Sequence, residues 1–301
     1  MAAGGNIQFQ QFLADEVRKV EGIYVPIHAG IIRRLLVRKT TLKRLHPNPD
    51  DEFCFPKIGP NYEIVSNYER EYRRIRKNKN DARFVSPAAK EPLTVERIRP
   101  DGYMIMNGHH RWAAAYRTGL KQIPVKIVNL TQENDIRKML AAASHDKRVT
   151  LDLDEVVFQK EKNGPAEKPL PFPFRNIYRE RLRLGIPALF RYLGVHGYDV
   201  WVFSANYYSM DYIRNLFRMY HAHVAGIVTG TARKAPKGSH TKEQLENRMK
   251  EKYPMTLHID NAAVTRVDSR TKTFAEFPLS GNDDTWSKEI MDVIGGMETQ
   301  K

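Results

Sequence analysis

Residues 148–157 read RVTLDLDEVV and decide how the second half of the chain is expected to fold. An apolar run leads directly into Asp152 and Asp154, two carboxylates at positions i and i+2. On a strand, side chains two apart point to the same face, so both carboxylates are expected at the carboxyl end of a buried strand. Open α/β sheets place their ligand sites at that end. The alternative is a helix N-terminus, which favours acidic residues without any chemistry.

Further short β-branched runs follow, with room for helices between them, at residues 200–203, 225–228 and 257–259. Strands that alternate with helices predict a parallel sheet with crossover helices. We therefore expect an α/β unit over residues 148–301.

Two of these runs end in polar side chains that suit phosphoryl transfer. Ser204 lies within WVFSAN, and Asp260 lies within TLHIDN. Lys242 opens a helical stretch between them. Together with Asp152 and Asp154, they would supply a nucleophile, an acid or base, a hydroxyl donor, a cation and a metal ligand.

In this order the residues resemble the haloacid-dehalogenase (HAD) superfamily of phosphohydrolases, over about residues 148–295. The resemblance implies a Rossmannoid parallel-sheet domain with a minimal cap and a magnesium-dependent phosphatase activity. It implies that Asp152 is the nucleophile, which becomes an aspartyl-phosphate. It also implies that Asp154 protonates the leaving group and then activates water.

The same resemblance assigns the remaining roles. Ser204 would hold the transferring phosphoryl group, and Lys242, or otherwise Lys237, would neutralise it. Asp260 would bind Mg²⁺ together with Asp152 and the backbone carbonyl of Asp154. Two departures leave open a domain kept only for binding: Glu155-Val156 stands where the family usually has Gly-Thr, and Asn261 stands where many members have a second acid.

The second motif is NGHHRWAAA at residues 107–115. A strand turns through Asn-Gly into a helix start, where Gly108 and the N–H groups of His109 and His110 suit a phosphate. Arg111 would add a bidentate contact. In the alternative interpretation, Arg111 pairs with a neighbouring acid and the histidines cover the end of the sheet.

This strand, turn and helix resemble the ParB/sulfiredoxin superfamily over residues 35–130. Its members bind nucleotide phosphates at the turn and include CTP-dependent partition proteins, a sulfinic-acid reductase and free-serine kinases. Histidine in place of the reductase's cysteine excludes the reductase chemistry. The resemblance implies a bound nucleoside triphosphate, with ATP expected first. Glu52, with Asp51 as the alternative, stands where the kinases have their general base.

The expected organisation is an N-terminal helical arm (1–30), a mixed α+β ParB/sulfiredoxin-like domain (31–130), a helical linker (131–147) that Thr131 caps, and the HAD-like domain (148–301). Within the second of these, residues 63–78 predict a helix, residues 93–106 a hairpin and residues 112–118 a helix.

The charge of the chain points to polyanionic partners. Its net charge is +14 with a pI near 9.7, and basic residues cluster at 33–44 and 70–79. Nucleic acid is the partner expected for such clusters, although a solvated surface is their commoner role. Cys54 is the single cysteine, so no intramolecular disulfide forms. We expect a cytoplasmic protein with no membrane span or signal peptide.

Together these patterns predict a bifunctional phosphate-ester enzyme. It would combine a kinase-like, nucleotide-dependent phosphotransferase domain with a Mg²⁺-dependent phosphatase, acting on nucleic-acid ends or modified bases. The alternative is a nucleotide-regulated DNA-binding protein, or a ParB-like nuclease, with an inactive HAD domain. The phosphate acceptor, the base of the nucleotide and the oligomeric state stay open.

Overall fold

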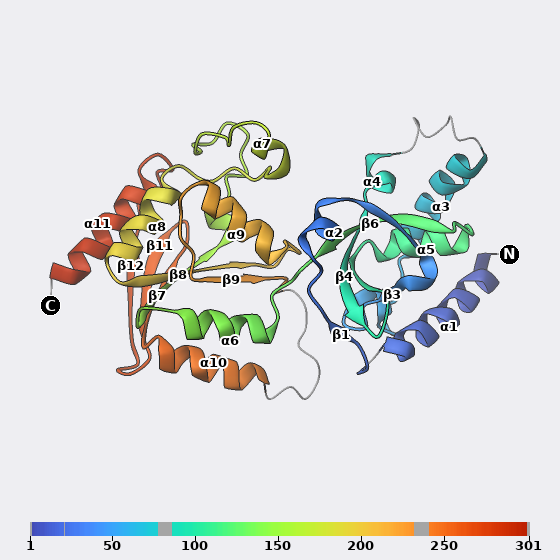
Figure 1. Cartoon of the computed structure of the whole chain (residues 1–301), viewed down its shortest axis with the longest axis horizontal. Coiled ribbons are helices and arrows are strands. Elements are labelled where there is room, and N and C mark those ends of the chain that lie inside the picture. Colours follow the sequence, from blue (N-terminus) through green and yellow to red (C-terminus); the bar gives the residue numbers. More distant parts are fainter. Residues whose placement is uncertain (1, 21, 78–85, 232–240, 300–301) are drawn as a thin grey trace. The chain divides into compact units, whose positions relative to one another are not determined.

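The computed structural model describes residues 2–20, 22–77, 86–231 and 241–299. The chain divides into two compact units, Met1–Asn129 and Leu130–Lys301, each with its own six-stranded sheet (Figure 1). The protein is thus a mixed α/β protein with two sheets. Among the described helices, none combines the length and the hydropathy that crossing a membrane requires.

The first unit contains, in chain order, α1 (Ala2–Val20), β1 (Val25–Pro26), α2 (Ile31–Leu35), β2 (Arg38–Thr41), the 3₁₀ turn η1 (Leu42–Arg44), β3 (Leu45–Pro47), the 3₁₀ turn η2 (Glu52–Cys54), α3 (Tyr62–Lys77), α4 (Pro87–Lys90), β4 (Leu93–Arg99), β5 (Tyr103–Asn107), α5 (His109–Arg117) and β6 (Gln122–Val128).

The second unit contains α6 (Glu133–Ala142), β7 (Lys147–Asp152), the π-type turn η4 (Leu153–Val157), α7 (Phe174–Ile177), α8 (Ile186–Val195), β8 (Tyr198–Ser204), α9 (Met210–Met219), β9 (Gly226–Thr229), α10 (Thr241–Lys252), β10 (Met255–Ile259), β11 (Ala263–Asp268), β12 (Thr273–Pro278) and α11 (Trp286–Thr299).

The sheet of the first unit is mixed, in the order β2-β6-β4-β5-β3, with β1 beside β4. The expected hairpin is confirmed, because β4 and β5 pair antiparallel. Helices α1, α3 and α5 pack on this sheet through a shared core that includes Phe9, Val65 and Trp112. Helix α5 begins at His109, three residues before the expected start, so the motif's histidines and arginine lie inside its first turn.

The second sheet has the order β12-β11-β10-β7-β8-β9. Strands β10, β7, β8 and β9 pair in parallel, as the alternating pattern predicts, whereas β11 and β12 extend the sheet antiparallel. Strand β8 shows why both faces are covered: Val200 and Val202 pack in the core with α8, α9 and α11, while Trp201 and Phe203 face the cluster with α6 and α10. Alternating side chains on a strand produce this division.

Residues 131–147, the expected linker, are part of the second unit. Helix α6 covers only part of them, and its Met139 packs against Trp201 and Tyr253. Gln132 caps the helix in a capping box with Asp135, so the expectation that Thr131 is the cap is wrong. The Thr131 hydroxyl instead donates to the carbonyl of Ile227, because the chain enters the unit beside β9.

Gly226 on β9 gives a test of this packing. A Cβ added there would lie 2.0 Å from Cδ2 of Trp201, whose buried indole donates to Tyr253 Oη at 3.0 Å and has little freedom to move. Gly226→Ala should lower the free energy of unfolding by about 1–3 kcal/mol. Gly194→Ala, in α8 with open space around the added Cβ, should raise it by up to about 1 kcal/mol. Urea unfolding followed by fluorescence measures both, and equal effects of the two substitutions would contradict the packing described here.

Candidate functional site

Three predicted site residues lie at one edge of the second sheet. Leu151 of β7 pairs in register with Ile259 of β10, so Asp152 and Asp260 follow at the same level. Asp152 in turn is paired with Phe203 of β8, which precedes Ser204. Adjacent parallel strands therefore bring these residues to one edge, as expected for the carboxyl ends of the strands.

Asp154 does not lie on the strand, so the argument from i, i+2 spacing is wrong for this pair. Strand β7 ends at Asp152, and Asp154 lies in the π-type turn η4. Asp152 caps this turn: its Oδ1 accepts hydrogen bonds from the N–H groups of Asp154 at 2.7 Å and Glu155 at 2.8 Å. The turn, and not strand alternation, brings the second carboxylate back over the sheet edge.

Two hydroxyl groups hold the Asp154 carboxylate. Ser204 Oγ donates to Oδ2 at 2.5 Å, and Tyr208 Oη donates to Oδ1 at 3.0 Å. Burial and the neighbouring carboxylate of Asp154 raise the pKa of Tyr208, so its hydroxyl keeps the proton that it donates. Tyr208 is not among the predicted site residues, because a tyrosine in the loop after β8 belongs to no motif that signals this contact.

Asp260 is fixed by its own loop. Its Oδ1 accepts from the N–H groups of Ala262 and Ala263 at 2.7 and 2.8 Å, and its backbone carbonyl accepts from Nε1 of Trp286 at 3.2 Å. For both Asp152 and Asp260, the hydrogen bonds from described residues go to Oδ1 of the carboxylate and not to Oδ2. The second oxygen of each carboxylate therefore stays available to a ligand.

The described residues include no group of three or more His, Cys, Asp or Glu side chains arranged to hold a metal ion. A cluster of the Asp152, Asp154 and Asp260 carboxylates is thus not formed, because Asp154 is turned toward Ser204 and Tyr208. The set implied by the resemblance, with two carboxylates and the backbone carbonyl of Asp154, stays a prediction.

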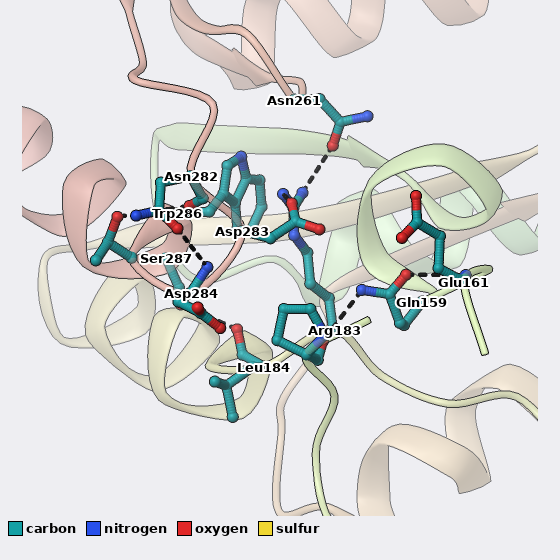
Figure 2. A network of polar contacts seen from close by, with 12 residues as sticks. Gln159, Glu161, Arg183, Leu184, Asn261, Asn282, Asp283, Asp284, Trp286 and Ser287 are labelled. Atoms are coloured by element: carbon teal, nitrogen blue, oxygen red, sulfur yellow. Dashed lines mark hydrogen bonds and ion pairs between the residues drawn. The ribbon is translucent and has the colours of Figure 1, made fainter. Parts of the chain in front are cut away.

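Arg183 is buried and contacts both Asn261, next to Asp260, and Asp283 (Figure 2). Arg183 Nη1 donates to Oδ1 of Asn261 at 2.7 Å, and Nδ2 of Asn261 donates to the carbonyl of Glu155 at 3.0 Å. The guanidinium also pairs with Asp283 and lies 4.1 Å from the ring centre of Trp286. Asn261 thus joins the Asp260 loop to the turn that carries Asp154.

Two lysines were predicted to supply the positive charge of this site. Lys242 belongs to α10, but its side chain is outside the described residues, as is the whole of Lys237.

In the first unit, Gly108 makes the turn between β5 and α5. Its φ is +100°, and a Cβ there would lie 2.5 Å from Cδ2 of Leu93, so only glycine fits. As the N-cap of α5, it contributes no side-chain hydrogen bond to the helix start. The first N–H groups of a helix have no intrahelical acceptor, so this end can accept an anion.

Arg111 lies beside this turn, with Nη2 3.0 Å from the position that a Cβ on Gly108 would take. Its buried guanidinium donates through Nη1 to the backbone carbonyl of Glu91 at 2.6 Å and lies 3.0 Å from the Glu91 carboxylate. The alternative of a neighbouring acid describes the contacts of Nη1, and the expectation that Arg111 bridges phosphate oxygens stays a prediction for the groups beside Gly108. A buried guanidinium needs such partners, and Glu91, directly after α4, supplies them.

His109 and His110 are hydrogen-bond acceptors that hold loops. Nε2 of His109 accepts from the N–H of Asn48, and Nε2 of His110 accepts from the N–H of Asn61, both at 3.2 Å. Burial lowers the pKa of His109 to about 4, which the nearby Asp51 carboxylate opposes, and burial also lowers the pKa of His110. Both rings thus stay neutral, as acceptors must.

The two candidates for a general base, Glu52 and Asp51, differ in their exposure and in their distance from the Gly108 motif. Glu52 is exposed at the start of η2, whereas Asp51 has Oδ2 at 3.5 Å from Nδ1 of His109 and Oδ1 bonded to the N–H of Phe53. Asp51, the alternative to Glu52, is therefore the acid that faces the Gly108 motif.

The basic clusters are partly solvent-facing and partly paired. Arg33, Arg38, Lys39 and Lys43 are exposed, and Arg44 pairs with Asp101 at 2.8 Å. On α3, Arg70 and Arg74 are exposed, and Arg73 pairs with Glu69 at 2.9 Å. The side chains of Arg76 and Lys77, and all of Lys79, lie outside the described residues. Both segments present positive charge to solvent.

Comparison with known proteins supports the ParB-like part. The model of the ParB N-terminal domain family matches residues 88–144, from α4 through α6. No curated protein matches the chain. The resemblance of the second unit to phosphohydrolases stays a prediction.

Two solved structures of a C-terminally truncated chromosome-partitioning protein ParB from Caulobacter crescentus are similar to part of the chain. One is complexed with CTP-γ-S and the other with the centromeric parS site; each is 26% identical with a TM-score of 0.23. The matches cover 36% of this chain and 56% and 51% of those chains, about half their length. This TM-score is too low to indicate a shared overall fold or function.

Acidification should destabilise the first unit through His109. Because its folded pKa, about 4, lies below the ordinary 6.5, the unfolded chain binds the proton first. The stability that neutral His109 gives is complete above about pH 6.5 and is lost as the pH falls toward 4, by up to about 1.4 kcal/mol per pH unit.

His109→Gln, which keeps an acceptor near Asn48, should flatten this dependence in urea unfolding measured across that pH window. His223→Gln, at an exposed histidine of the second unit, is the control and should leave the dependence unchanged. A pH dependence in His109→Gln equal to that of the unsubstituted protein would show that His109 does not cause it.

Proposed function

We propose that the chain is a nucleotide-binding protein of the ParB-like kind that binds nucleic acid through its first unit. The family match over residues 88–144 carries this proposal, because it includes the strand, turn and helix around Gly108. The resemblance described above implies that such a turn binds nucleotide phosphates. A nucleotide-regulated nucleic-acid binder is therefore preferred to a kinase as the function of this unit.

The contacts of the turn indicate which groups would hold the phosphates. Both histidine rings and Nη1 of Arg111 are bonded to protein groups. The N–H groups at the start of α5, with Nη2 and Nε of Arg111 beside Gly108, are therefore the candidate donors for an anion. Backbone donors and the positive end of a helix favour phosphate whatever the base of the nucleotide. Phosphoryl transfer with Glu52 or Asp51 as the base stays a prediction.

Exposed basic residues support the nucleic-acid part of the proposal. Six basic residues of the first unit are exposed to solvent: Arg33, Arg38, Lys39 and Lys43 around α2 and β2, and Arg70 and Arg74 on α3. Contacts of this kind neutralise phosphates and are insensitive to base sequence.

Calorimetric titration with CTP, ATP and GTP, with and without Mg²⁺, tests the nucleotide site. Gly108→Ala should weaken binding at least about ten-fold, because displacing the helix start removes charge-assisted hydrogen bonds worth about 1.5–3 kcal/mol each. The matched control is Gly102→Ala: its φ is +92° and its added Cβ would lie 2.6 Å from the Arg44 carbonyl, at the far end of the same hairpin.

Gly102→Ala should bind nucleotide as the unsubstituted protein does, once circular dichroism shows that both variants are folded. If none of the three nucleotides binds the unsubstituted protein, the first unit is a scaffold and this half of the proposal fails.

A second activity, hydrolysis of phosphate esters, is favoured by the edge of the second sheet. The specific observation is that Ser204 and Tyr208 both donate to Asp154, while Asp152 keeps one carboxylate oxygen available. We propose that Asp152 attacks phosphorus and forms an aspartyl-phosphate as the bond to the leaving oxygen breaks, and that protonated Asp154 gives its proton to that oxygen. Water, giving a proton to Asp154, would then cleave the aspartyl-phosphate and release phosphate and free Asp152. Tyr208 would orient Asp154, so that its carboxyl group meets the leaving group and not the nucleophile.

The donor set at this edge fits a hard divalent cation. The available carboxylate oxygens of Asp152 and Asp260, with the backbone carbonyl of Asp154, are ligands that Mg²⁺ prefers. When bound, Mg²⁺ would neutralise the negative charge of the phosphoryl oxygens. The network of Arg183, Asn261 and the Glu155 carbonyl would keep the two ligand-bearing loops together.

Hydrolysis of p-nitrophenyl phosphate in the presence of Mg²⁺ tests this activity. Asp152→Asn should abolish turnover, because the amide is a poor nucleophile. Tyr208→Phe should keep turnover but shift the pH–rate profile to higher pH, because Asp154 loses a donor that stabilises its charged form.

Tyr220→Phe, which removes a hydroxyl bonded to the Lys168 carbonyl, is the matched control and should leave the profile in place. Full turnover in Asp152→Asn would exclude Asp152 as the nucleophile, and an unshifted profile in Tyr208→Phe would exclude the orienting role of Tyr208.

A further inference from the structure

The chain between the turn η4 and α8 forms a segment with a firmly held base. Phe158 and Leu182 form an antiparallel bridge, and the N–H of Gln159 donates to the carbonyl of Arg181 at 2.8 Å. Arg181 Nη1 donates to the carbonyl of Lys162 at 2.8 Å, which closes the first part of the loop. Leu170 is buried in the core of the unit. The base of the segment is therefore ordered by backbone and core contacts.

The outer part of this segment, residues 171–179, is called here the aromatic arm. Figure 1 shows it around α7, projecting from the rest of the second unit. Residues 171–177 are all exposed, with Phe172 at 71% and Phe174 at 37% of full exposure. Tyr178 anchors the end of the arm, with its ring centre 5.0 Å from that of Tyr212. Two phenylalanines are thus presented to solvent on an anchored support.

The charge of the segment complements a polyanion. Residues 160–184 contain seven basic and three acidic residues. One of the basic residues, Arg183, is buried and paired with Asp283. Two of the acids face inward: Glu167 accepts from the N–H of Gly185 at 2.8 Å, and Glu180 accepts from the hydroxyl of Tyr212. Arg175 and Arg179 are exposed on the arm itself. The arm therefore offers aromatic rings and guanidinium groups together.

We propose that the aromatic arm binds the unpaired bases and backbone of a single-stranded nucleic acid. Phenylalanine rings stack on any base, and arginine neutralises the phosphates between bases. A duplex fits less well, because its bases are already stacked and their faces are covered. An apolar protein surface fits less well, because Arg175 and Arg179 would lose their hydration without a countercharge.

The position of the arm connects it to the acidic edge. Its segment begins directly after η4, the turn that carries Asp154, and Phe158 at its base contacts Tyr208 with ring centres 5.8 Å apart. The segment that carries the arm therefore begins beside Asp154 and Tyr208, the residues proposed for hydrolysis of a bound nucleic acid. The inference rests on the proposed phosphate-ester hydrolysis in one respect: it names unpaired nucleic acid as the substrate class.

Fluorescence anisotropy of the full chain with a labelled, unphosphorylated single strand of about 12 nucleotides tests the proposal. Phe172→Ala combined with Phe174→Ala should weaken binding at least about five-fold, through loss of base stacking. Tyrosine at both positions should restore it, because a ring suffices. Phe274→Ala, at a phenylalanine on β12 that is 66% exposed, is the matched control and should bind as the unsubstituted protein does.

Salt dependence gives a second readout. Arg175→Ala should reduce the log–log slope of affinity against salt by about 0.7, the value for one phosphate on a single strand. Arg270→Ala, at an exposed arginine beside β12, should leave the slope unchanged. A duplex of the same sequence should bind more weakly and respond little to the alanine pair at 172 and 174.

Unchanged single-strand binding in the Phe172→Ala and Phe174→Ala protein would overturn the proposal. So would an equal loss in Phe274→Ala, or an equal effect on the duplex, which would indicate that unpaired bases are not read by the arm. The probe has no phosphate to remove and needs no nucleotide. Full turnover in Asp152→Asn, or the absence of nucleotide binding, would overturn the proposed functions of the two units and is therefore separable from failure of this inference.

Discussion

Strand β7 is hydrogen-bonded along both edges, to β10 and to β8, and this double pairing positions the chemistry of the second unit. An interior parallel strand is covered on both faces, so its side chains are apolar or bonded until the chain leaves the sheet. Val149 and Leu151 meet the core on one face, and Thr150 bonds Nδ1 of His258 at 2.6 Å on the other. Asp152 is the last residue of β7, where the strand leaves the covered part of the sheet and a charged side chain can be accommodated. Asp260 and Ser204 reach the same edge through the neighbouring strands.

Several polar groups that look functional in the sequence hold the structure together. The neutral rings of His109 and His110 accept backbone N–H groups from two loops, and Arg111 ties α5 to the chain after α4. Arg183 has the same role in the second unit, where it joins the Asp283 segment to Asn261. A buried polar group without a partner is costly, so each of these residues has its partners supplied by the fold.

Much of the fold could be predicted, because it depends on short periodic patterns. Short β-branched runs predicted the four parallel strands of the second sheet, and two strand-like runs around a turn predicted the β4–β5 hairpin. Boundaries were less certain: α5 begins at His109 and not at Trp112, and Gln132, not Thr131, caps α6. These details depend on competition between side chains for the same backbone groups, which a local pattern does not contain.

The sequence by itself determined which residues end the buried strands and where positive charge is concentrated, because both follow from residue order and composition. Only the tertiary structure decided their partners. Tyr208 meets Asp154 from 54 positions away, Arg183 meets Asn261 from 78, and Arg111 meets the Glu91 carbonyl from 20. The folding of η4 likewise decided that Asp154 faces two hydroxyl groups. Such contacts are set by how strands, turns and loops pack in space, and sequence spacing does not encode those distances.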